Sequence, residues 1–271
     1  YGVELDRMSA KIAGYLYPEA NIQNIGFERT NYPDGYFDVA IGNVPFGDYR
    51  VNDPVYNSHG FLIHDYFFAK TLDKLRAGGV AAYITTKGTM DKESTKVREF
   101  LFKKAELLGA IRLPNTAFKN AGTKVTADIL FLQKREREIE NPEWTTITED
   151  AQGFRINSYF VQHPEMILGT MQEISGPYGM ETTCVEKEGV PLGERLRAAI
   201  SHITGHIPER VEEERAEFRY EAEQPTDAPD ASEVRMYSYV LSDTGEVYYK
   251  NVWNKKRQRK QQKHVSQVWS Q

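Results

Sequence analysis

Cysteine is almost absent from this sequence. Cys184 is the only one among 271 residues, so no disulfide can form within the chain and no cluster of thiolates can hold a metal ion. A chain without disulfides suits a reducing compartment, and we expect a cytoplasmic protein. His59 and His64 flank the start of one predicted helix, but no cysteine or carboxylate stands at ligand spacing beside them. The sequence therefore predicts surface or capping roles for these histidines and no metal site.

Long apolar runs and an excess of basic charge are also missing. No run approaches the roughly 20 apolar residues that span a bilayer, and no signal peptide is visible, so we expect no membrane partner. Lys and Arg number 34 against 39 Asp and Glu, which gives a net charge of −5. This balance argues against a surface coated by nucleic acid, although a local basic patch can still bind a phosphate backbone. The length and the 40% hydrophobic content indicate one or two globular domains.

The most informative stretch runs from residue 37 to residue 47. Residues 37–41 are rich in apolar side chains and predict a short, fully buried strand. Asn43, Pro45 and Phe46 follow it, at the edge where ligands bind in open α/β sheets. An amide that both donates and accepts, beside a ring that can stack, suits an enzyme acting on a flipped-out base. The alternative is a turn in which Asn43 caps the strand and Phe46 fills the core.

The first predicted strand, at residues 2–6, carries two carboxylates at its end. A helix with one apolar face (Met8, Ile12, Ala13 and Leu16) and a strand at residues 21–27 come next, which predicts a parallel βαβ unit. At the end of such a strand, Glu4 and Asp6 can accept hydrogen bonds from a ribose diol. The alternative for Asp6 is a helix cap.

The next elements alternate between helix and strand. Apolar spacing predicts a helix at residues 61–75, a strand at 80–85, a helix at 95–107, and strands at 108–113 and 128–133. The last two strands leave no room for a crossover helix, so they pair antiparallel or splay apart. Residues 47–60 form a long loop of the kind that carries function. Lys119 and Lys124 lie in a second loop, where they either meet a phosphate or are simply solvated.

Several short runs resemble a known family when they are read in order. They are Asn43-Val44-Pro45-Phe46, Ile63-His64-Asp65-Tyr66-Phe67, Lys87-Gly88-Thr89-Met90-Asp91-Lys92 and Gly109-Ala110-Ile111-Arg112-Leu113-Pro114. With them the sequence resembles the S-adenosylmethionine-dependent N6-adenine DNA methyltransferases, and most closely the methylase segments of large helicase-plus-methylase proteins on bacterial mobile elements. The resemblance covers residues 1–136 and extends more weakly through residues 157–160 and 163–169.

The resemblance implies an α/β fold with a Rossmann-like class I methyltransferase sheet, closed by an antiparallel hairpin, and S-adenosylmethionine as the cofactor. Glu4, supported by Asp6, matches the acid that holds the cofactor ribose. Phe27 matches the residue that packs on the cofactor adenine, while many relatives have an acid at the position of Gly26. The remaining matches are in the base-binding motif: Asn43 and the carbonyl of Val44 accept from the target amine, Pro45 stiffens the loop and Phe46 stacks on the base. Val44 replaces the usual proline and keeps its carbonyl.

The resemblance also implies a first strand and a glycine-rich loop that would precede Gly2. That strand would lie between the strands of Val3 and Val39, so we expect a partial sheet in a piece cut from a longer polypeptide, with a helicase domain as one possible companion. The expected activity is methylation of N6 of adenine in DNA. The alternatives are methylation of a protein glutamine and a non-catalytic DNA-binding or scaffold segment.

Composition changes along the second half predict the domain boundaries. We expect a catalytic domain at residues 1–136, an accessory helical region at 137–208, an acidic linker at 209–233, and a β-hairpin with a basic tail at 234–271, which together make a small α+β C-terminal region. The tail has a basic cluster that either binds a nucleic-acid backbone or connects to a downstream domain. Its members are Lys255, Lys256, Arg257, Arg259 and Lys260.

Overall fold

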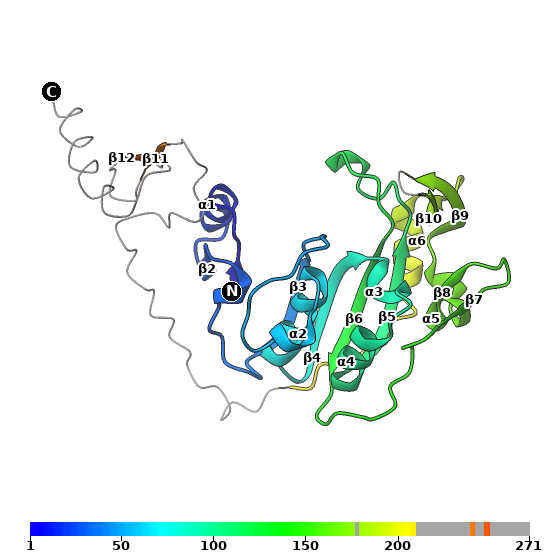
Figure 1. Ribbon diagram of the computed structural model, residues 1–271, viewed down its shortest axis with the longest axis horizontal. Coiled ribbons are helices and arrows are strands. Elements are labelled where there is room, and N and C mark those ends of the chain that lie inside the picture. Colours follow the sequence, from blue (N-terminus) through cyan, green and yellow to red (C-terminus); the bar gives the residue numbers. More distant parts are fainter. Residues whose placement is uncertain (177–178, 210–238, 242–246, 250–271) are drawn as a thin grey trace. The chain divides into compact units, whose positions relative to one another are not determined.

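The computed structural model describes residues 1–176, 179–209, 239–241 and 247–249 (Figure 1). The chain divides into two units, Tyr1–Ala216 and Glu217–Gln271. In the second unit, β11 (Tyr239–Leu241) pairs antiparallel with β12 (Val247–Tyr249), which confirms the predicted hairpin. The basic cluster at residues 255–260 lies outside the described residues, as does the predicted linker beyond Glu209.

A four-stranded sheet forms the centre of the first unit, with the strand order β3-β4-β6-β5. Strand β3 (Phe37–Asn43) runs parallel to β4 (Leu75–Thr86). Strand β6 (Ala127–Lys134) runs antiparallel to both β4 and β5 (Ala105–Leu113). The antiparallel pairing of β5 and β6 confirms the prediction, because their connection is too short for a crossover helix.

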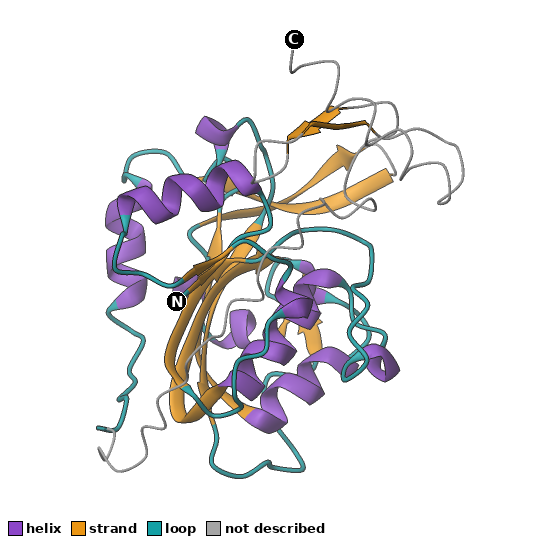
Figure 2. Cartoon of the chain, turned by 90° about the vertical axis from the view of Figure 1, so that its left-hand side faces the viewer, coloured by secondary structure: helices purple, strands orange, loops and turns teal. Residues whose placement is uncertain are grey.

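Helices cover one face of this sheet (Figure 2). Helix α2 (Ile63–Lys74) and helix α4 (Lys96–Lys104) pack together against β4 and β5, and α3 (Gly88–Asp91) follows β4. The predicted helix at residues 95–107 is wrong in its last three residues, which begin β5. Ala105 and Leu107 alternate into the core, and ladder pairing with β6 outweighs the helical pattern there.

The predicted βαβ unit is confirmed at the N-terminus. Strand β1 (Gly2–Val3) pairs parallel with β2 (Ile22–Gln23), and α1 (Arg7–Leu16) connects them. These strands are shorter than expected and form a sheet of their own. The apolar face of α1 is not buried: Met8, Ile12 and Leu16 are exposed, because a sheet of two short strands is too narrow to cover the helix.

Strand β3 is less buried than the sequence predicts. Its side chains Val39 and Ile41 are 49% and 77% exposed, so the expectation of a fully buried strand is wrong. The reason is that β3 pairs with β4 on one side, while none of the described strands pairs with its other edge. Strands β1 and β3 are thus outer strands of two separate sheets. This arrangement agrees with the expectation of a partial sheet interrupted between Val3 and Val39.

The region at residues 137–208, for which the sequence predicts helices, also contains strands. Strands β7 (Ile147–Glu149) and β8 (Arg155–Asn157) pair antiparallel, and so do β9 (Gly169–Gly176) and β10 (Gly179–Glu186). Packing against the central sheet favours these hairpins over local helical spacing, since Ile156 of β8, Met171 of β9 and Cys184 of β10 share one hydrophobic core with the sheet. The other elements are α5 (Ser158–Gln162), α6 (Leu192–Ile200), η1 (Phe27–Arg29), η2 (Asn57–His59), η3 (Lys119–Ala121) and η4 (Pro164–Met166).

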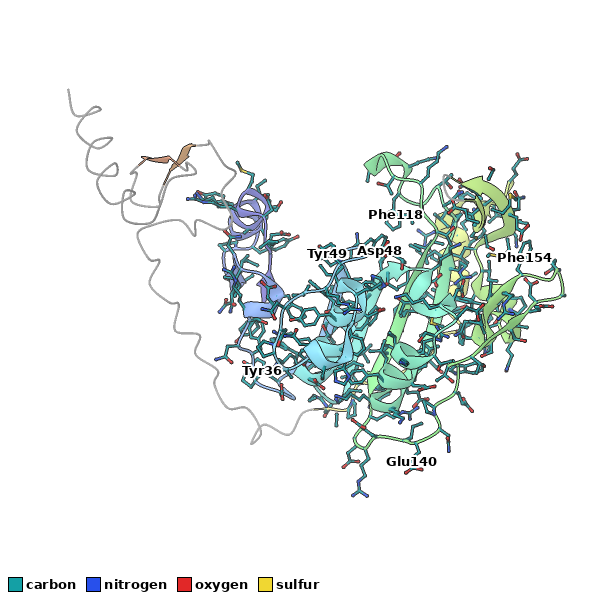
Figure 3. The ribbon with its side chains drawn as sticks, viewed as in Figure 1. Tyr36, Asp48, Tyr49, Phe118, Glu140 and Phe154 are labelled. Carbon is teal, nitrogen blue, oxygen red and sulfur yellow. The ribbon has the colours of Figure 1, made fainter. Side chains whose placement is uncertain are left out.

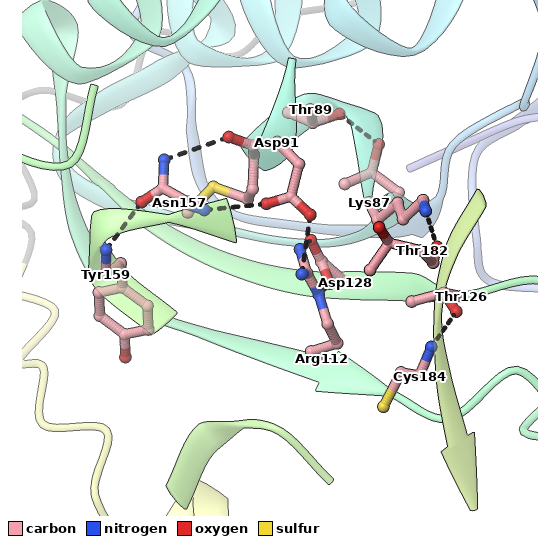
Figure 4. A network of polar contacts seen from close by, with 12 residues as sticks. Lys87, Thr89, Asp91, Arg112, Thr126, Asp128, Asn157, Tyr159, Thr182 and Cys184 are labelled. Carbon is pink, nitrogen blue, oxygen red and sulfur yellow. Dashed lines mark hydrogen bonds and ion pairs between the residues drawn. The ribbon is translucent and has the colours of Figure 1, made fainter. Parts of the chain in front are cut away.

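A buried ionic network joins this region to the sheet (Figure 4). The side chain of Arg112 is fully buried and donates two hydrogen bonds of 2.9 Å to Asp128. It also lies 2.8 Å from Asp91, which accepts from the backbone of Asn157 at 3.0 Å. Burial alone would lower the pKa of Arg112, but Asp128 and Asp91 outweigh it and raise that pKa. Separating these elements would leave a buried charge uncompensated, which is strongly unfavourable. The network therefore holds β5, β6 and α3 against the start of α5.

Candidate functional site

A cavity of about 580 Å³ runs along the facing edges of β1 and β3. Its lining includes Glu4, just after β1, and Phe27, in η1. On the other side it includes Asn43, Val44 and Pro45. The structure thus brings five of the seven predicted catalytic and cofactor-binding residues around one space. The remaining two, Phe46 with 38% exposure and the exposed Asp6, do not belong to the described lining.

Asn43 and Val44 have opposite surroundings at the end of β3. Asn43 is the last residue of the strand and its side chain is exposed to the cavity. Val44 donates its backbone N–H to the carbonyl of Ile84 at 3.1 Å and buries its side chain in the main core, with 3% exposure. Packing therefore holds the loop where a proline ring would otherwise stiffen it.

The two acids after β1 make different contacts. Glu4 accepts the backbone N–H of Asp6 at 2.8 Å and remains part of the cavity lining. Asp6 is the N-cap of α1 and accepts the backbone N–H of Ser9 at 2.7 Å. That hydrogen bond lowers the pKa of Asp6. The structure gives Asp6 the capping position that was its alternative role, and it leaves Glu4 as the acid facing the cavity.

Glu28 is a lining residue that the sequence did not single out. A Cβ atom placed on Gly26 would overlap the carboxylate of Glu28, so this carboxylate fills the space of a side chain at position 26. Phe27 lies between them in sequence and packs its ring 4.9 Å from that of Phe67. The 3-10 turn at Phe27–Arg29 brings Glu28 back to this place. The only signal in the sequence is an acid two residues after the glycine.

His64 lies in the first turn of α2 and is only 3% exposed, so the expected surface or capping role is wrong for it. Its Nε2 atom is 3.1 Å from Nζ of Lys92, which donates to Asp65 at 2.9 Å. Burial lowers the pKa of His64, against the opposing influence of Asp65. His59 stacks on Phe61 with 5.0 Å between ring centres. Within the described ranges, no three His, Cys, Asp or Glu side chains are grouped so that they could hold a metal ion.

Lys119 and Lys124 are exposed in the loop between β5 and β6. Figure 3 shows Phe118 of this loop at the same edge of the sheet as Asp48 and Tyr49, which follow the base-binding motif, while Tyr36 lies at the opposite end of β3. The five basic residues of the tail lie outside the described residues. Among the helices that the structure describes, none is long and apolar enough to cross a membrane.

Residues 4–158, more than half of the chain, match the family model for N-6 DNA methylase. The chain belongs to this family. The match of the N-6 DNA methylase model begins at Glu4 and ends at Ser158, so it includes every lining residue named above as well as Lys119 and Lys124. Membership indicates methyl transfer as the general chemistry of the fold.

Among curated proteins, this N-6 DNA methylase chain is similar to Defense against restriction protein B of Escherichia phage P1. The two are 33% identical over 142 residues, which is 50% of this chain and 6% of the phage protein. The chain therefore spans a small part of that relative's length.

Solved structures give partial likenesses. The EcoKI M protein of a type I restriction enzyme is 20% identical with a TM-score of 0.42, over 54% of this chain and 33% of that one. A type I restriction-modification methyltransferase subunit from Streptococcus thermophilus is 15% identical with a TM-score of 0.42, over 74% and 42%.

Proposed function

We propose that this chain is part of an enzyme that transfers a methyl group from S-adenosylmethionine to N6 of adenine in DNA. The observation that carries the proposal is the position of Asn43. Its amide ends β3 at the cavity that Glu4 and Phe27 line from the opposite side. Membership of the N-6 DNA methylase family supports the same reaction.

The described lining fits the nucleoside end of the cofactor. The carboxylate of Glu4 would accept from the ribose hydroxyls, and the ring of Phe27 would pack on the adenine. Glu28, whose carboxylate takes the place of a side chain on Gly26, would accept from the exocyclic amine of that adenine. When bound, S-adenosylmethionine supplies the electrophilic methyl group.

Asn43 and Val44 would orient the target base. The side-chain oxygen of Asn43 and the main-chain carbonyl of Val44 would accept the two N6 hydrogens and direct the nitrogen lone pair toward the methyl group. Phe46, which is partly exposed, would stack on the flipped ring. Both carbonyls would hold N6 in place while it gains the methyl group and loses one proton to solvent, which balances the reaction. Positioning of this kind would supply most of the rate enhancement.

We further propose that the complete site belongs to a larger polypeptide, encoded by a phage or another mobile element, in which other domains such as a helicase accompany this one. The small share of the phage P1 relative that the chain spans supports this. DNA would then reach the edge of the sheet that carries Asn43, Lys119 and Lys124. The open edges of β1 and β3 also favour a second candidate, a scaffold segment without turnover.

Asn43→Ala tests the proposal and separates the two candidates. In the complete protein we expect the variant to lose adenine methylation while its unfolding midpoint stays within a degree or two, because an exposed strand end contributes little to the core. Transfer of labelled methyl groups to adenine-containing duplex measures the activity. Val190→Ala, a change at an exposed residue outside the described lining of the cavity, serves as the matched control. Methylation by the Asn43 variant at the wild-type rate would remove this residue from the mechanism.

A further inference from the structure

Lys70 of α2 is buried between two segments that flank the cavity. The residue is 4% exposed. Its ammonium donates to Oδ2 of Asp53 at 3.1 Å and to the main-chain carbonyl of Glu28, also at 3.1 Å. Asp53 belongs to the loop at residues 47–60 that follows the base-binding motif, whereas Glu28 belongs to η1 beside the nucleoside end. A single cation therefore connects the two halves of the proposed site.

On the loop side, Asp53 organises a compact turn. Its main-chain carbonyl accepts the N–H groups of Tyr56 and Asn57, both at 2.9 Å. Its carboxylate accepts the hydroxyl of Tyr66 at 2.8 Å in addition to Lys70, and Asp53 is only 5% exposed. A buried carboxylate needs a cation and hydrogen bonds to remain charged. The turn at residues 53–57 thus depends on Lys70.

On the nucleoside side, Lys70 contacts the aromatic wall of the cavity. Its Nζ atom lies 5.3 Å from the centre of the Phe27 ring, within the range of a cation–π interaction. Phe27 lines the cavity, so a base that packs on Phe27 touches a ring already in contact with the ammonium. The Phe27 ring and the Glu28 carbonyl are two of the groups that hold the Lys70 ammonium, so a base that orders this segment also orders Lys70.

We propose that Lys70 is a positioning residue that couples the two halves of the site, so that a nucleoside packed on Phe27 orders the turn at residues 53–57, in the loop that follows the base-binding motif. The inference rests on the proposed function, because it takes the nucleoside to be that of the cofactor. Coupling of this kind is reciprocal. When the turn at residues 53–57 is ordered, it holds Lys70 in place, and Lys70 then positions Phe27 for the cofactor.

The chain contains a matched control for a purely structural ion pair. Arg195 lies 3.8 Å from Glu186 and donates to the main-chain carbonyl of Leu168, so it joins a carboxylate to a carbonyl as Lys70 does. None of these three residues belongs to the described lining of the cavity. A variant at Arg195 therefore removes a partly buried cation without touching the proposed link.

Hydrogen–deuterium exchange on the full chain tests the coupling, with millimolar adenosine as the probe. We expect Lys70→Met to speed exchange several-fold in residues 26–30 and in residues 53–57 together, while Arg195→Met leaves both segments unchanged. Adenosine should slow exchange in both segments of the wild-type chain and of Arg195→Met. In Lys70→Met it should slow exchange only in residues 26–30. Asp53→Asn, which keeps the side-chain shape, should give the same result as Lys70→Met and replaces it if that variant fails to fold.

Specific outcomes would overturn the inference. Equal exchange at residues 53–57 in Lys70→Met and Arg195→Met would do so, and so would faster exchange throughout the chain, including the paired strands β4 and β6. Protection by adenosine of residues 26–30 alone in the wild-type chain would overturn the coupling and leave the nucleoside site intact. Protection of neither segment would instead overturn the nucleoside site of the proposed function and the coupling with it.

Discussion

Adjacent residues at the end of β3 do different work. Val44 is held in the core and fixes the backbone, which leaves the Asn43 side chain in the cavity with a set direction. The same division appears at Phe27, which lines the cavity, and Gly26, whose missing side chain makes room for the Glu28 carboxylate. In both places a buried or small residue positions the polar group next to it. The direction of these polar groups therefore depends on the buried side chain of Val44 and on the missing side chain of Gly26.

The pKa of His64 gives a prediction about stability. Because burial holds this pKa below its ordinary value, the unfolded chain binds a proton before the folded chain does as pH falls. Stability from His64 is complete above the unfolded value of about 6.5, and it is lost as pH falls toward the folded value, by at most about 1.4 kcal/mol per pH unit. Urea unfolding between pH 7.5 and 5 should show a smaller loss in His64→Gln than in the wild-type chain. The exposed His202→Gln is the control, and a slope unchanged by His64→Gln would contradict the prediction.

Among the elements, the two loops at the carboxyl edge of the sheet are held in different ways. Asp53 and Lys70 anchor residues 47–60 from within. The loop between β5 and β6 is instead tied to β10, since Asn115 donates its N–H to the carbonyl of Cys184 at 2.7 Å, and Cys184 donates its own to Thr126 at 2.9 Å. Lys119 and Lys124 thus extend from a loop with fixed ends. A surface for DNA at this edge would be preformed on that side.

The C-terminal tail gives a prediction at the scale of an element. Deleting residues 251–271 should weaken DNA binding and flatten its dependence on salt, since each phosphate contact contributes about 0.9 to the log–log salt slope. The slope is obtained from the affinity for a duplex between about 50 and about 300 mM salt, because phosphate contacts weaken over this range. Replacing the five basic residues of the tail with glutamine is the matched control for chain length. An unchanged slope would assign the tail to linkage alone.

In the first unit as a whole, the sheet of β1 and β2 is separate from the four-stranded sheet that contains β3. Strands β1 and β3 face the same cavity, and the apolar side chains Val39 and Ile41 are exposed on β3. An additional apolar strand, parallel to both, would pair with the open edges and cover these side chains. It would also carry the glycine-rich loop implied by the family resemblance to the methionine end of the cofactor.

We therefore expect residues 1–271 alone to bind S-adenosylmethionine poorly and to show no turnover. Glu4 and Phe27 hold only the nucleoside end in our proposal. Calorimetric titration should show tighter binding by a chain extended before Tyr1 with a strand and a glycine-rich loop. The same extension with its glycines changed to valine is the control, since it retains the strand and blocks close approach of the backbone. Micromolar binding by residues 1–271 alone would show that the additional strand is wrongly assigned.

The sequence by itself determined those features that depend on neighbours along the chain. It predicted the strand at residues 37–41, which the structure extends to Asn43, and the helix over most of residues 61–75. It also predicted the antiparallel pairing of β5 with β6 and the hairpin of β11 and β12. In each, local apolar spacing or a short connection leaves few alternatives. The tertiary structure alone decided the exposure of Ile41 and of α1, the return of Glu28 to Gly26, and the bridge from Lys70 to Asp53. These features depend on which strands lie side by side and on which distant charges are buried together, and spacing along the sequence contains neither.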